Sequence, residues 1–349
     1  MATQTGITIS GPNEPYTVVD TIPRPTPGPT QALVKTLYVG LNPVEPFMQH
    51  TGMLVESWPA VLGSDVSGVV LEVGADCKKI KKGDYIFTCV PVGISEFSSF
   101  QEAFLVEEDW VFKKGDSVGL EEACTVGAGL LTAGLALLDG QGLELPAPGS
   151  KAAEKDSWVI VMGGSGSVGR YCVQLASLAG YKVLASCSPS KNELALKAGA
   201  SATFNNRAPV EEQLAEIGRI TGGKFAHIVD TSLMALDLSV KALESISKAS
   251  GAKYLATVDD WSEMTVPDSL NLYRVKLGML GRTGTEQEHI TAKIAEMVAV
   301  FQAHIDAGQI RPLDYHLVDG EGWEAIIKGI ADMEAGKLPK KPVVKAQSE

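Results

Sequence analysis

The sequence predicts an α/β protein in which a doubly wound parallel sheet is inserted into a second, mainly β domain. Three observations lead to this prediction. Apolar strand-like runs alternate with helix-like runs in the middle of the chain, a glycine-rich turn directly follows one of them, and short strands broken by turns fill the first third. A length of 349 residues suits two domains. We place the first in residues 1–125 plus 276–349 and the second in residues 126–275.

The first domain is predicted to be an irregular β domain. Its strand-like runs are rich in β-branched and aromatic residues and are separated by Gly and Pro clusters. These runs are Gln31–Val39, Val66–Val73 and Asp84–Cys89. After Gly284 the chain returns as helices over 286–307 and 322–335 and an extended end over 342–345. This tail is too small to form a third domain, so we expect it to fold back on the first.

The second domain is predicted from strand and helix patterns that follow one another along the chain. A small-residue, apolar helix begins at Ala123 and ends near Asp139. Helical runs then separate the strand-like runs, which are Trp158–Met162, Lys182–Cys187, His227–Asp230 and Tyr254–Val258. Such alternation indicates a parallel sheet with helices on both faces. His227 opens a buried strand, and we interpret it as structural.

Composition restricts the partners and the compartment. The formal charge of −12 and the pI of about 5.0 disfavour nucleic acid and anionic membranes as partners. The five cysteines are odd in number and lack C-x-x-C spacing, so free thiols in a reducing compartment are expected. The first ten residues have no basic segment followed by an apolar run, and no apolar stretch approaches the ~18 residues of a membrane span. The expected location is cytoplasmic.

A glycine-rich turn is the strongest functional motif. Gly164, Ser165, Gly166, Ser167, Val168 and Gly169 form the pattern G-x-G-x-x-G directly after the apolar run Trp158–Met162. The first glycine is expected to permit the tight turn, the second to let the backbone approach a pyrophosphate, and the third to let helix and strand pack closely. The alternative is a glycine-rich turn without a ligand. A phosphate-binding P-loop is excluded because Arg170 and Tyr171 follow the last glycine.

The residues at the end of the second strand favour NADPH over NADH. An NAD site places an acid about 20 residues after the motif, where it bonds the ribose 2′-hydroxyl. Ser188, Ser190 and Lys191 occupy this region, without an acid, and their hydroxyl and ammonium groups suit a 2′-phosphate. Ser188 and Pro189 also suit the start of a helix, and the two interpretations are compatible.

The sequence lacks the ligands of a zinc dehydrogenase. Such enzymes need clustered Cys and His, and the five His here are scattered, with Gly63-Ser64-Asp65 standing where a Gly-His-Glu motif belongs. We therefore predict no metal. Without a Lewis acid, a conjugated acceptor is easier to reduce than an isolated ketone.

The order of motifs along the chain resembles that of the medium-chain dehydrogenase/reductase superfamily. The resemblance covers about residues 5 to 345 and is greatest to the zinc-free, quinone-oxidoreductase-like branch, including fungal ToxD-like oxidoreductases and trans-acting enoyl reductases. The motifs that carry it are Leu41–Val44, Leu62–Val70, Gly83-Asp84, Leu131–Gly134, Gly163–Gly169, Ala185–Pro189 and Lys197–Ala200. It implies a GroES-like first domain, a Rossmann-type second domain and a cofactor between them.

The resemblance also assigns residues to the cofactor. It implies that Ser165 to Val168 line the pyrophosphate and that Ser188, Ser190 and Lys191 meet the 2′-phosphate. Val44 to Phe47 and Thr132 are expected near the nicotinamide. Asp65 is expected to be a structural hydrogen-bonding acid.

Two positions depart from the pattern of the relatives. Asn206 replaces a tyrosine that many of them carry beside the adenosine phosphate, and Arg207 is expected to supply charge there. Phe47 stands where relatives offer Lys or Tyr, and a phenyl ring donates no proton. We therefore leave the catalytic residue open and expect the proton to come from solvent, from the cofactor ribose or from another hydroxyl, with Tyr273 as a candidate.

The sequence supports one main function and two alternatives. The main hypothesis is an NADPH-dependent reductase of activated C=C bonds in enones, enals, quinones or enoyl thioesters. Its partner is then an apolar, conjugated small molecule and, in some settings, a biosynthetic synthase. The first alternative is an NADPH-binding accessory protein with little turnover. The second is a zinc-independent ketone reductase.

Overall fold

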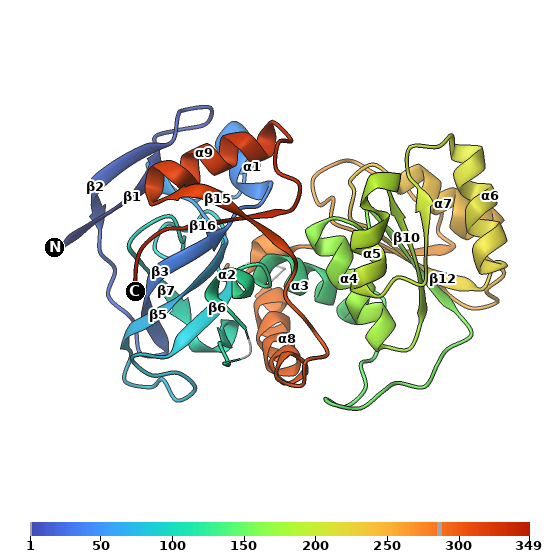
Figure 1. The fold of residues 1–349 in the computed structure, drawn as a ribbon, viewed down its shortest axis with the longest axis horizontal. Helices are drawn as coiled ribbons and strands as arrows, with labels where there is room; N and C mark the ends of the chain where they lie inside the picture. The colour runs from blue at the N-terminus through green and yellow to red at the C-terminus, as the bar shows by residue number, and fades with distance from the viewer. Residues whose placement is uncertain (1, 117, 285–287) are drawn as a thin grey trace. The chain divides into compact units, whose positions relative to one another are not determined.

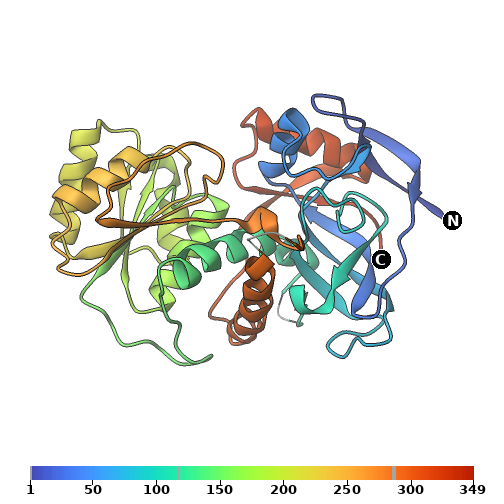
Figure 2. The same cartoon turned by 180° about the vertical axis from the view of Figure 1, so that it is seen from behind.

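The computed structural model describes residues 2–116, 118–284 and 288–349, and the chain divides into two compact units. The first unit consists of Met1–Ala128, Gly278–Gln302 and Arg311–Glu349. The second consists of Gly129–Leu277 and Ala303–Ile310. Figures 1 and 2 show the two ends of the chain, blue and red, within one unit and the middle of the chain in the other.

A short part of the C-terminal tail belongs to the second unit, whereas the domain boundaries predicted from the sequence place it in the first. This part is Ala303–Ile310, at the end of helix α8 (Glu288–Asp306). The Gln309 side chain explains its position: the carboxamide accepts from Gly149 N at 2.8 Å and donates to Ser150 O at 2.7 Å.

The second unit contains a parallel sheet, and its described residues give six strands in the order β11-β10-β9-β12-β13-β14. The chain runs outward from β9 to β11 and then from β12 to β14, which is the strand order 3-2-1-4-5-6 of a Rossmann fold. The strands are β9 (Trp158–Met162), β10 (Lys182–Cys187), β11 (Ala202–Asn205), β12 (Phe225–Asp230), β13 (Lys253–Thr257) and β14 (Leu270–Arg274). The predicted fold class is confirmed.

Helices cover both faces of this sheet (Figure 1). They are α4 (Ser167–Leu178), α5 (Asn192–Ala198), α6 (Val210–Thr221) and α7 (Leu236–Ser245). The apolar face predicted for α4 packs inward, since Cys172, Leu175 and Ala179 are buried. The sequence patterns did not single out β11, α6 or β14, which are short or carry many polar residues.

The first unit is mainly β, with a seven-stranded sheet and a three-stranded sheet among its described residues. The larger sheet contains β3 (Gln31–Gly40), β5 (Asp65–Val73), β6 (Tyr85–Cys89), β7 (Ala103–Glu107), β8 (Phe112–Lys113), β15 (Tyr315–Glu321) and β16 (Lys341–Lys345). The smaller contains β1 (Thr3–Ile9), β2 (Thr17–Pro23) and β4 (Ala60–Val61). The remaining helices of this unit are α1 (Val44–Thr51), α2 (Leu120–Ala123), α8 and α9 (Trp323–Glu334), with a 3₁₀ turn η1 (Glu108–Trp110).

The C-terminal tail completes the sheet of the first unit. Val343 and Val344 of β16 pair antiparallel with Gly40 and Val39 of β3. The predicted return of the tail is thus realised by strand pairing. The helix predicted over 286–307 is observed as α8 from Glu288; residues 286 and 287 lie outside the described part of the chain.

The apolar segment that begins near Ala123 is helical and buried. It comprises α2, α3 (Gly127–Gly134) and a π-helical turn η2 (Leu135–Asp139). Among the described residues, Leu120–Asp139 is the one helical stretch long and apolar enough to cross a membrane, and 83% of its apolar window is buried within the protein. The sequence analysis had found no such stretch, but this degree of burial is that of a core helix.

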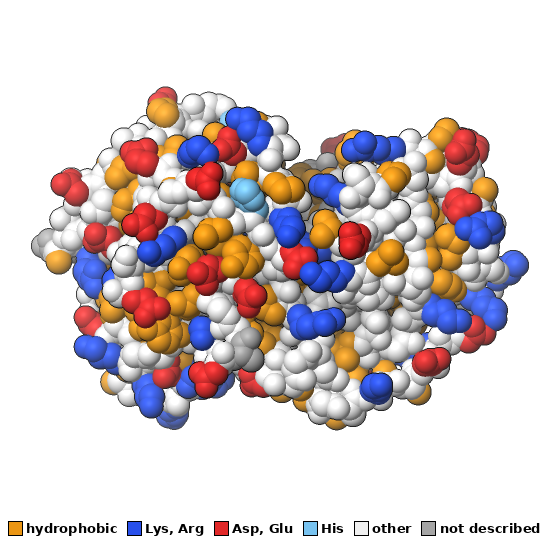
Figure 3. All heavy atoms as spheres, in the orientation of Figure 1, with side chains coloured by type: hydrophobic (Ala, Val, Ile, Leu, Met, Phe, Trp, Pro, Cys, Tyr) orange, Lys and Arg blue, Asp and Glu red, His pale blue; other side chains and the backbone are white. Residues whose placement is uncertain are grey.

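The surface charges and the state of the cysteines are those expected from the amino-acid composition. Acidic and basic side chains are interspersed over the face shown in Figure 3. All five cysteines lie in the described residues and are free, and Cys172 and Cys187 are buried as expected.

Candidate functional site

The glycine-rich turn lies at the carboxyl end of β9, where open parallel sheets bind their ligands. The left-handed backbone belongs to Gly163 (φ 78°), one residue before the motif, and not to Gly164 as the motif suggests. A Cβ on Gly164 would lie 2.5 Å from Ala185 Cβ, so close packing against β10 excludes a side chain there. Neighbouring strands hold the turn, because Gly163 N donates to Ser186 Oγ at 2.9 Å and Thr231 Oγ1 donates to Met162 O at 2.8 Å.

The other two glycines of the motif have different surroundings. A Cβ on Gly169 would lie 2.2 Å from Gly163 O, so the third glycine is required for close packing of helix and strand, as predicted. A Cβ on Gly166 would meet Gly163 O at 3.4 Å, which is an ordinary contact, and the residue is exposed. Space beside Gly166 is therefore open to a ligand.

The N-terminus of α4 offers donors to an anion. The first intrahelical bond runs from Arg170 N to Gly166 O at 2.9 Å, so the N–H groups of Ser167, Val168 and Gly169 precede the hydrogen-bond ladder. Among the described residues, no side chain caps the helix at Gly166. Uncapped N–H groups at the positive end of a helix bind phosphate oxygens.

The turns after β10 and β11 bring together the residues predicted for the 2′-phosphate. Cys187 pairs with Asn205 in the sheet, and Asn206 N donates to Cys187 O at 3.2 Å, so the segments that follow lie side by side. The first segment carries Ser188, Ser190 and Lys191, and the second carries Asn206 and Arg207.

The groups in these two turns are available to an anion. Ser188 Oγ lies 3.4 Å from Ser190 Oγ. Ser188 occupies the N-cap position of the 3₁₀ turn η3 (Pro189–Lys191), with Pro189 at the first position as predicted, but its side chain makes no cap hydrogen bond. In the described structure neither Lys191 nor Arg207 has a carboxylate partner.

The residues predicted near the nicotinamide come from both units. Val44 and Phe47 lie on α1 in the first unit, and Thr132 lies on α3 in the second with 8% of its surface exposed. Phe47 is partly exposed and is not part of the hydrophobic core, whereas its neighbour Met48 is fully buried in it. The phenyl ring is therefore not an ordinary core side chain.

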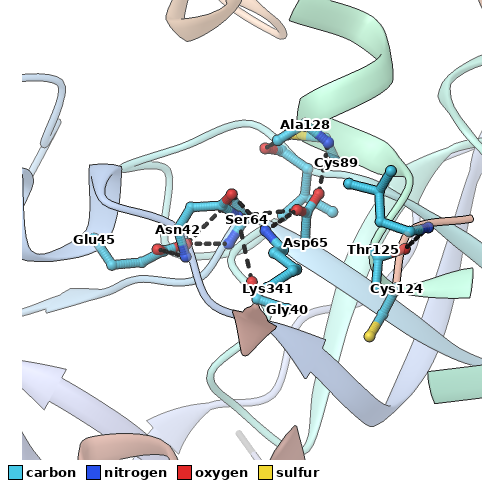
Figure 4. A network of polar contacts seen from close by, with 12 residues as sticks. Gly40, Asn42, Glu45, Ser64, Asp65, Cys89, Cys124, Thr125, Ala128 and Lys341 are labelled. Atoms are coloured by element: carbon cyan, nitrogen blue, oxygen red, sulfur yellow. Dashed lines mark hydrogen bonds and ion pairs between the residues drawn. The ribbon is translucent and has the colours of Figure 1, made fainter. Parts of the chain in front are cut away.

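A buried polar network fixes the start of α1 (Figure 4). Glu45 Oε2 accepts from Asn42 N at 2.6 Å, and Oε1 accepts from Ser64 Oγ at 2.5 Å and from Ser64 N at 3.1 Å. Asn42 Nδ2 donates in turn to Ser64 Oγ and to Asp65 Oδ2, both at 2.9 Å. The Glu45 carboxylate thus connects the helix that carries Val44 and Phe47 to Ser64, directly before β5.

Lys341 supplies the positive charge of the network. Its Nζ donates to Asp65 Oδ2 at 2.7 Å and to Asn42 Oδ1 at 2.5 Å, and the two charged side chains are 2% and 0% exposed. Asp65 Oδ1 also accepts from Ala128 N at 2.6 Å. Asp65 therefore has the structural, hydrogen-bonding role that was expected. No sequence pattern predicts the role of Lys341, because 276 residues separate it from Asp65.

Burial dominates the acidity of Glu45. Desolvation raises its pKa from the ordinary 4.5 to about 7, against the opposing effects of its hydrogen bond from Ser64 and of the Lys341 charge. Lys341 is ion-paired with Asp65 and acts on Glu45 through its charge.

Tyr273 and His227 have structural surroundings. The Tyr273 hydroxyl donates to Asp139 Oδ2 at 2.7 Å, and burial together with this carboxylate raises the tyrosine pKa. The hydroxyl proton is thus held by an acceptor within the second unit, and the proposal of Tyr273 as a proton donor stays a prediction. His227 stacks on Tyr254 at 5.0 Å, and burial lowers its pKa to about 4, so it is neutral.

Within residues 2–116, 118–284 and 288–349, no three or more His, Cys, Asp or Glu side chains are grouped so that they could hold a metal ion. Ser64 and Asp65 take part in the network described above.

Comparison with known proteins places these features in a family. Residues 28–127 match the alcohol dehydrogenase GroES-like domain. The chain is 30% identical over 329 residues to the trans-enoyl reductase RAP2 of Pyricularia oryzae, covering 88% of each chain. It is 28% identical over 328 residues to the trans-enoyl reductase traG of Penicillium crustosum, covering 88% of this chain and 87% of the relative.

A solved structure shows the same fold. The crystal structure of the CurK enoyl reductase aligns over 99% of both chains with a TM-score of 0.74 and 17% identity. With the matching domain and the full-length relatives, the chain belongs to the medium-chain dehydrogenase/reductase superfamily of oxidoreductases.

Proposed function

We propose that this protein is an NADPH-dependent, zinc-independent reductase of activated C=C bonds in enones, enals, quinones or enoyl thioesters. The observation that carries the cofactor assignment is the pair of anion-binding features at the carboxyl edge of the parallel sheet. One is the uncapped start of α4, and the other is the Lys191 and Arg207 pair beside it. The second unit is then the dinucleotide-binding domain and the first the catalytic domain.

The residues present fit the cofactor. The N–H groups of Ser167, Val168 and Gly169 suit a pyrophosphate, with Gly164, Ser165 and Gly166 forming the open turn beside them. Ser188, Ser190, Lys191, Asn206 and Arg207 suit the 2′-phosphate through hydroxyl, amide and cationic groups. When bound, the reduced nicotinamide supplies the hydride.

The relatives support the proposed substrate class. The similar proteins RAP2 and traG are trans-enoyl reductases, which favours a conjugated C=C bond as the acceptor. Val44 and Phe47 offer apolar contact to a flat, conjugated substrate and exclude water. A proton is then taken from solvent or from a hydroxyl group. The five free thiols fit a cytoplasmic location.

Replacement of Lys191 by Ala tests the cofactor assignment. Loss of one charge-assisted phosphate contact should weaken NADPH binding about ten- to a hundredfold and leave NADH binding unchanged. Cofactor fluorescence titration measures both affinities. Lys241→Ala, on the exposed side of α7, is the matched control and should change neither. Equal losses for the two cofactors in Lys191→Ala would contradict a 2′-phosphate site.

An NADPH-binding accessory protein is the second candidate. The observations that favour it are the non-donating ring of Phe47 and the engagement of the Tyr273 hydroxyl with Asp139. NADPH oxidation across a panel of enones, quinones, enoyl thioesters and ketones separates the candidates. Turnover confined to ketones would instead indicate a ketone reductase, and binding without turnover would indicate the accessory role.

A further inference from the structure

Thr231 contacts the glycine-rich turn from the neighbouring strand. It directly follows β12, which pairs with β9, and its Oγ1 donates to Met162 O at 2.8 Å and to Gly163 O at 3.3 Å. The two segments approach closely, since a Cβ on Gly163 would lie 2.9 Å from Thr231 Oγ1. One hydroxyl thus contacts both the last residue of β9 and the left-handed residue at which the chain turns.

Strand β10 contacts the same turn from the other side. Ser186 Oγ accepts from Gly163 N at 2.9 Å, and Ser186 O accepts from Gly164 N at 2.9 Å. Within the turn, Gly166 N donates to Gly163 O at 3.0 Å. The N–H groups of these three glycines are therefore bonded within the protein, which leaves the N–H groups at the start of α4 for a ligand.

The segment that carries Thr231 is fixed by a buried carboxylate. Asp230 is 1% exposed, and its Oδ1 accepts from Ser232 N at 2.8 Å and from Ser232 Oγ at 2.6 Å, while Oδ2 accepts from Ala235 N at 3.0 Å. Leu233 lies between these residues with a left-handed backbone (φ 63°), which is uncommon for a residue with a side chain. Such a conformation persists where the surroundings over-determine it. These bonds hold the backbone of Thr231 beside the turn.

Fold stability does not require the Thr231 hydroxyl. Met162 O also accepts from Thr231 N at 3.0 Å, and Gly163 O also accepts from Gly166 N at 3.0 Å. Loss of the hydroxyl therefore leaves neither carbonyl without a donor. Its cost in folding free energy should be small, because large costs arise when a buried polar group loses its partner. The contribution of the hydroxyl is to restrict the turn.

We propose that Thr231 is a positioning residue for the dinucleotide, whose hydroxyl holds the glycine-rich turn in the shape that directs the N–H groups at the start of α4 to the pyrophosphate. This inference rests on the dinucleotide binding proposed above. NADPH and NADH share the pyrophosphate, so loss of the hydroxyl should weaken both equally. Loss of Lys191, by contrast, should affect only the cofactor that carries the 2′-phosphate.

The experiment compares Thr231→Val, which removes the hydroxyl and keeps the branched shape, with Thr231→Ser, which keeps the hydroxyl, in the full-length protein. Thr231→Val should weaken NADPH and NADH about five- to tenfold each, and the affinity for adenosine 2′-monophosphate, which has no pyrophosphate, should stay within about twofold. Amide hydrogen exchange of Gly164 and Gly166 should accelerate by a similar factor. Thr231→Ser should restore the values of the unmodified protein.

Thr221→Val is the matched control for loss of a threonine hydroxyl. Thr221 Oγ1 donates to Ile217 O at 2.7 Å and accepts from Gly223 N at 3.1 Å at the end of α6. Helix α6 precedes β12 and Thr231 follows it, so the two threonines lie at opposite ends of that strand. Thr221→Val should lower Tm, because Gly223 N loses this acceptor, and should leave both cofactor affinities within about twofold.

Several outcomes overturn the inference. Unchanged affinity for both cofactors in Thr231→Val would show that the hydroxyl does not position the turn for a ligand. Loss confined to NADPH would assign Thr231 to the 2′-phosphate instead. Equal losses in Thr231→Val and Thr221→Val would indicate general loosening of the unit. An unmodified protein that binds neither cofactor refutes the dinucleotide site and this inference together, while the exchange data still report on the turn.

A second variant covers misfolding. If Thr231→Val does not fold, Thr231→Ala removes the same hydroxyl without placing a methyl group against the two carbonyls. It should show the same loss for NADPH and NADH and the same faster exchange in the turn. Affinities equal to those of the unmodified protein would overturn the inference.

Discussion

Glu45→Gln replaces a fully buried carboxyl by a group of the same shape that does not titrate. In the structure this side chain lies between Asn42 and Ser64, with Lys341 as the neighbouring cation and Asp65 as the neighbouring anion. Burial raises the pKa of Glu45 from 4.5 to about 7. The pH dependence of stability therefore separates the charge of this residue from its hydrogen bonds.

The sign follows from proton linkage. The folded protein holds the Glu45 proton more tightly than the unfolded chain, so stability from this group is fully present below pH 4.5 and is lost as pH rises through about 7. The corresponding free energy is about 3 kcal/mol in total, of which about 2.5 kcal/mol is lost between about pH 5 and pH 8.5. The amide of the variant contributes no such dependence.

The measurement is urea unfolding of both proteins at several pH values. The free energy of unfolding of the unmodified protein minus that of Glu45→Gln should fall by about 2.5 kcal/mol from about pH 5 to pH 8.5. A constant offset from altered hydrogen bonds cancels in this comparison. Glu72→Gln, at an exposed position of β5, is the matched control for the same substitution at the surface. A Glu45→Gln difference that stays constant, or that grows with pH, would refute the reasoning.

Three other predictions concern the glycine-rich turn, the Phe47 ring and the expected absence of zinc. Gly169→Ala should unfold at a clearly lower temperature in a thermal melt, since its Cβ would lie 2.2 Å from Gly163 O, whereas Gly166→Ala should melt normally and bind NADPH more weakly. A normal melt for Gly169→Ala would contradict this packing. Phe47→Ala should raise KM for bulky enones and keep kcat for small ones within about tenfold, with little change in melting, whereas Met48→Ala should cost about 2–5 kcal/mol of stability. Loss of all turnover in Phe47→Ala at unchanged stability would show an essential role for the ring. Elemental analysis should find no stoichiometric zinc, and a chelator should leave activity unchanged; chelator-sensitive activity with one zinc per chain would disprove the prediction.

Local patterns were sufficient for the glycine turn and the strand and helix beside it, because these elements are adjacent in sequence. The apolar run of β9, the glycines of the turn and the apolar face of α4 follow one another within about 20 residues. The close packing at Gly169 involves a residue only six positions away in the sequence, Gly163. The motif therefore predicts correctly that Gly169 allows helix and strand to pack closely. Motif and structure differ at Gly163, which has the left-handed backbone one position before the motif.

The two turns proposed to hold the 2′-phosphate differ in how their residues were predicted. Ser188 and Lys191 come after β10, and their prediction rests on their spacing from the glycine motif. Asn206 and Arg207 entered only through resemblance, because β11 is too short and polar to be recognised as a strand. Parallel pairing of β10 with β11 is what brings the two cationic side chains to one edge.

By itself, the sequence determined the alternation of strands and helices, the position of the glycine-rich turn and the free state of the cysteines, since these depend on periodicity, short spacings and composition. Tertiary structure alone decided the partners of the buried charges. Lys341 reaches Asp65 because β16 pairs with β3 across the whole length of the chain, and Arg282 reaches Leu54 over 228 positions. Such contacts produce no periodic pattern in the sequence, because each involves a single side chain whose position is set by the packing of distant segments.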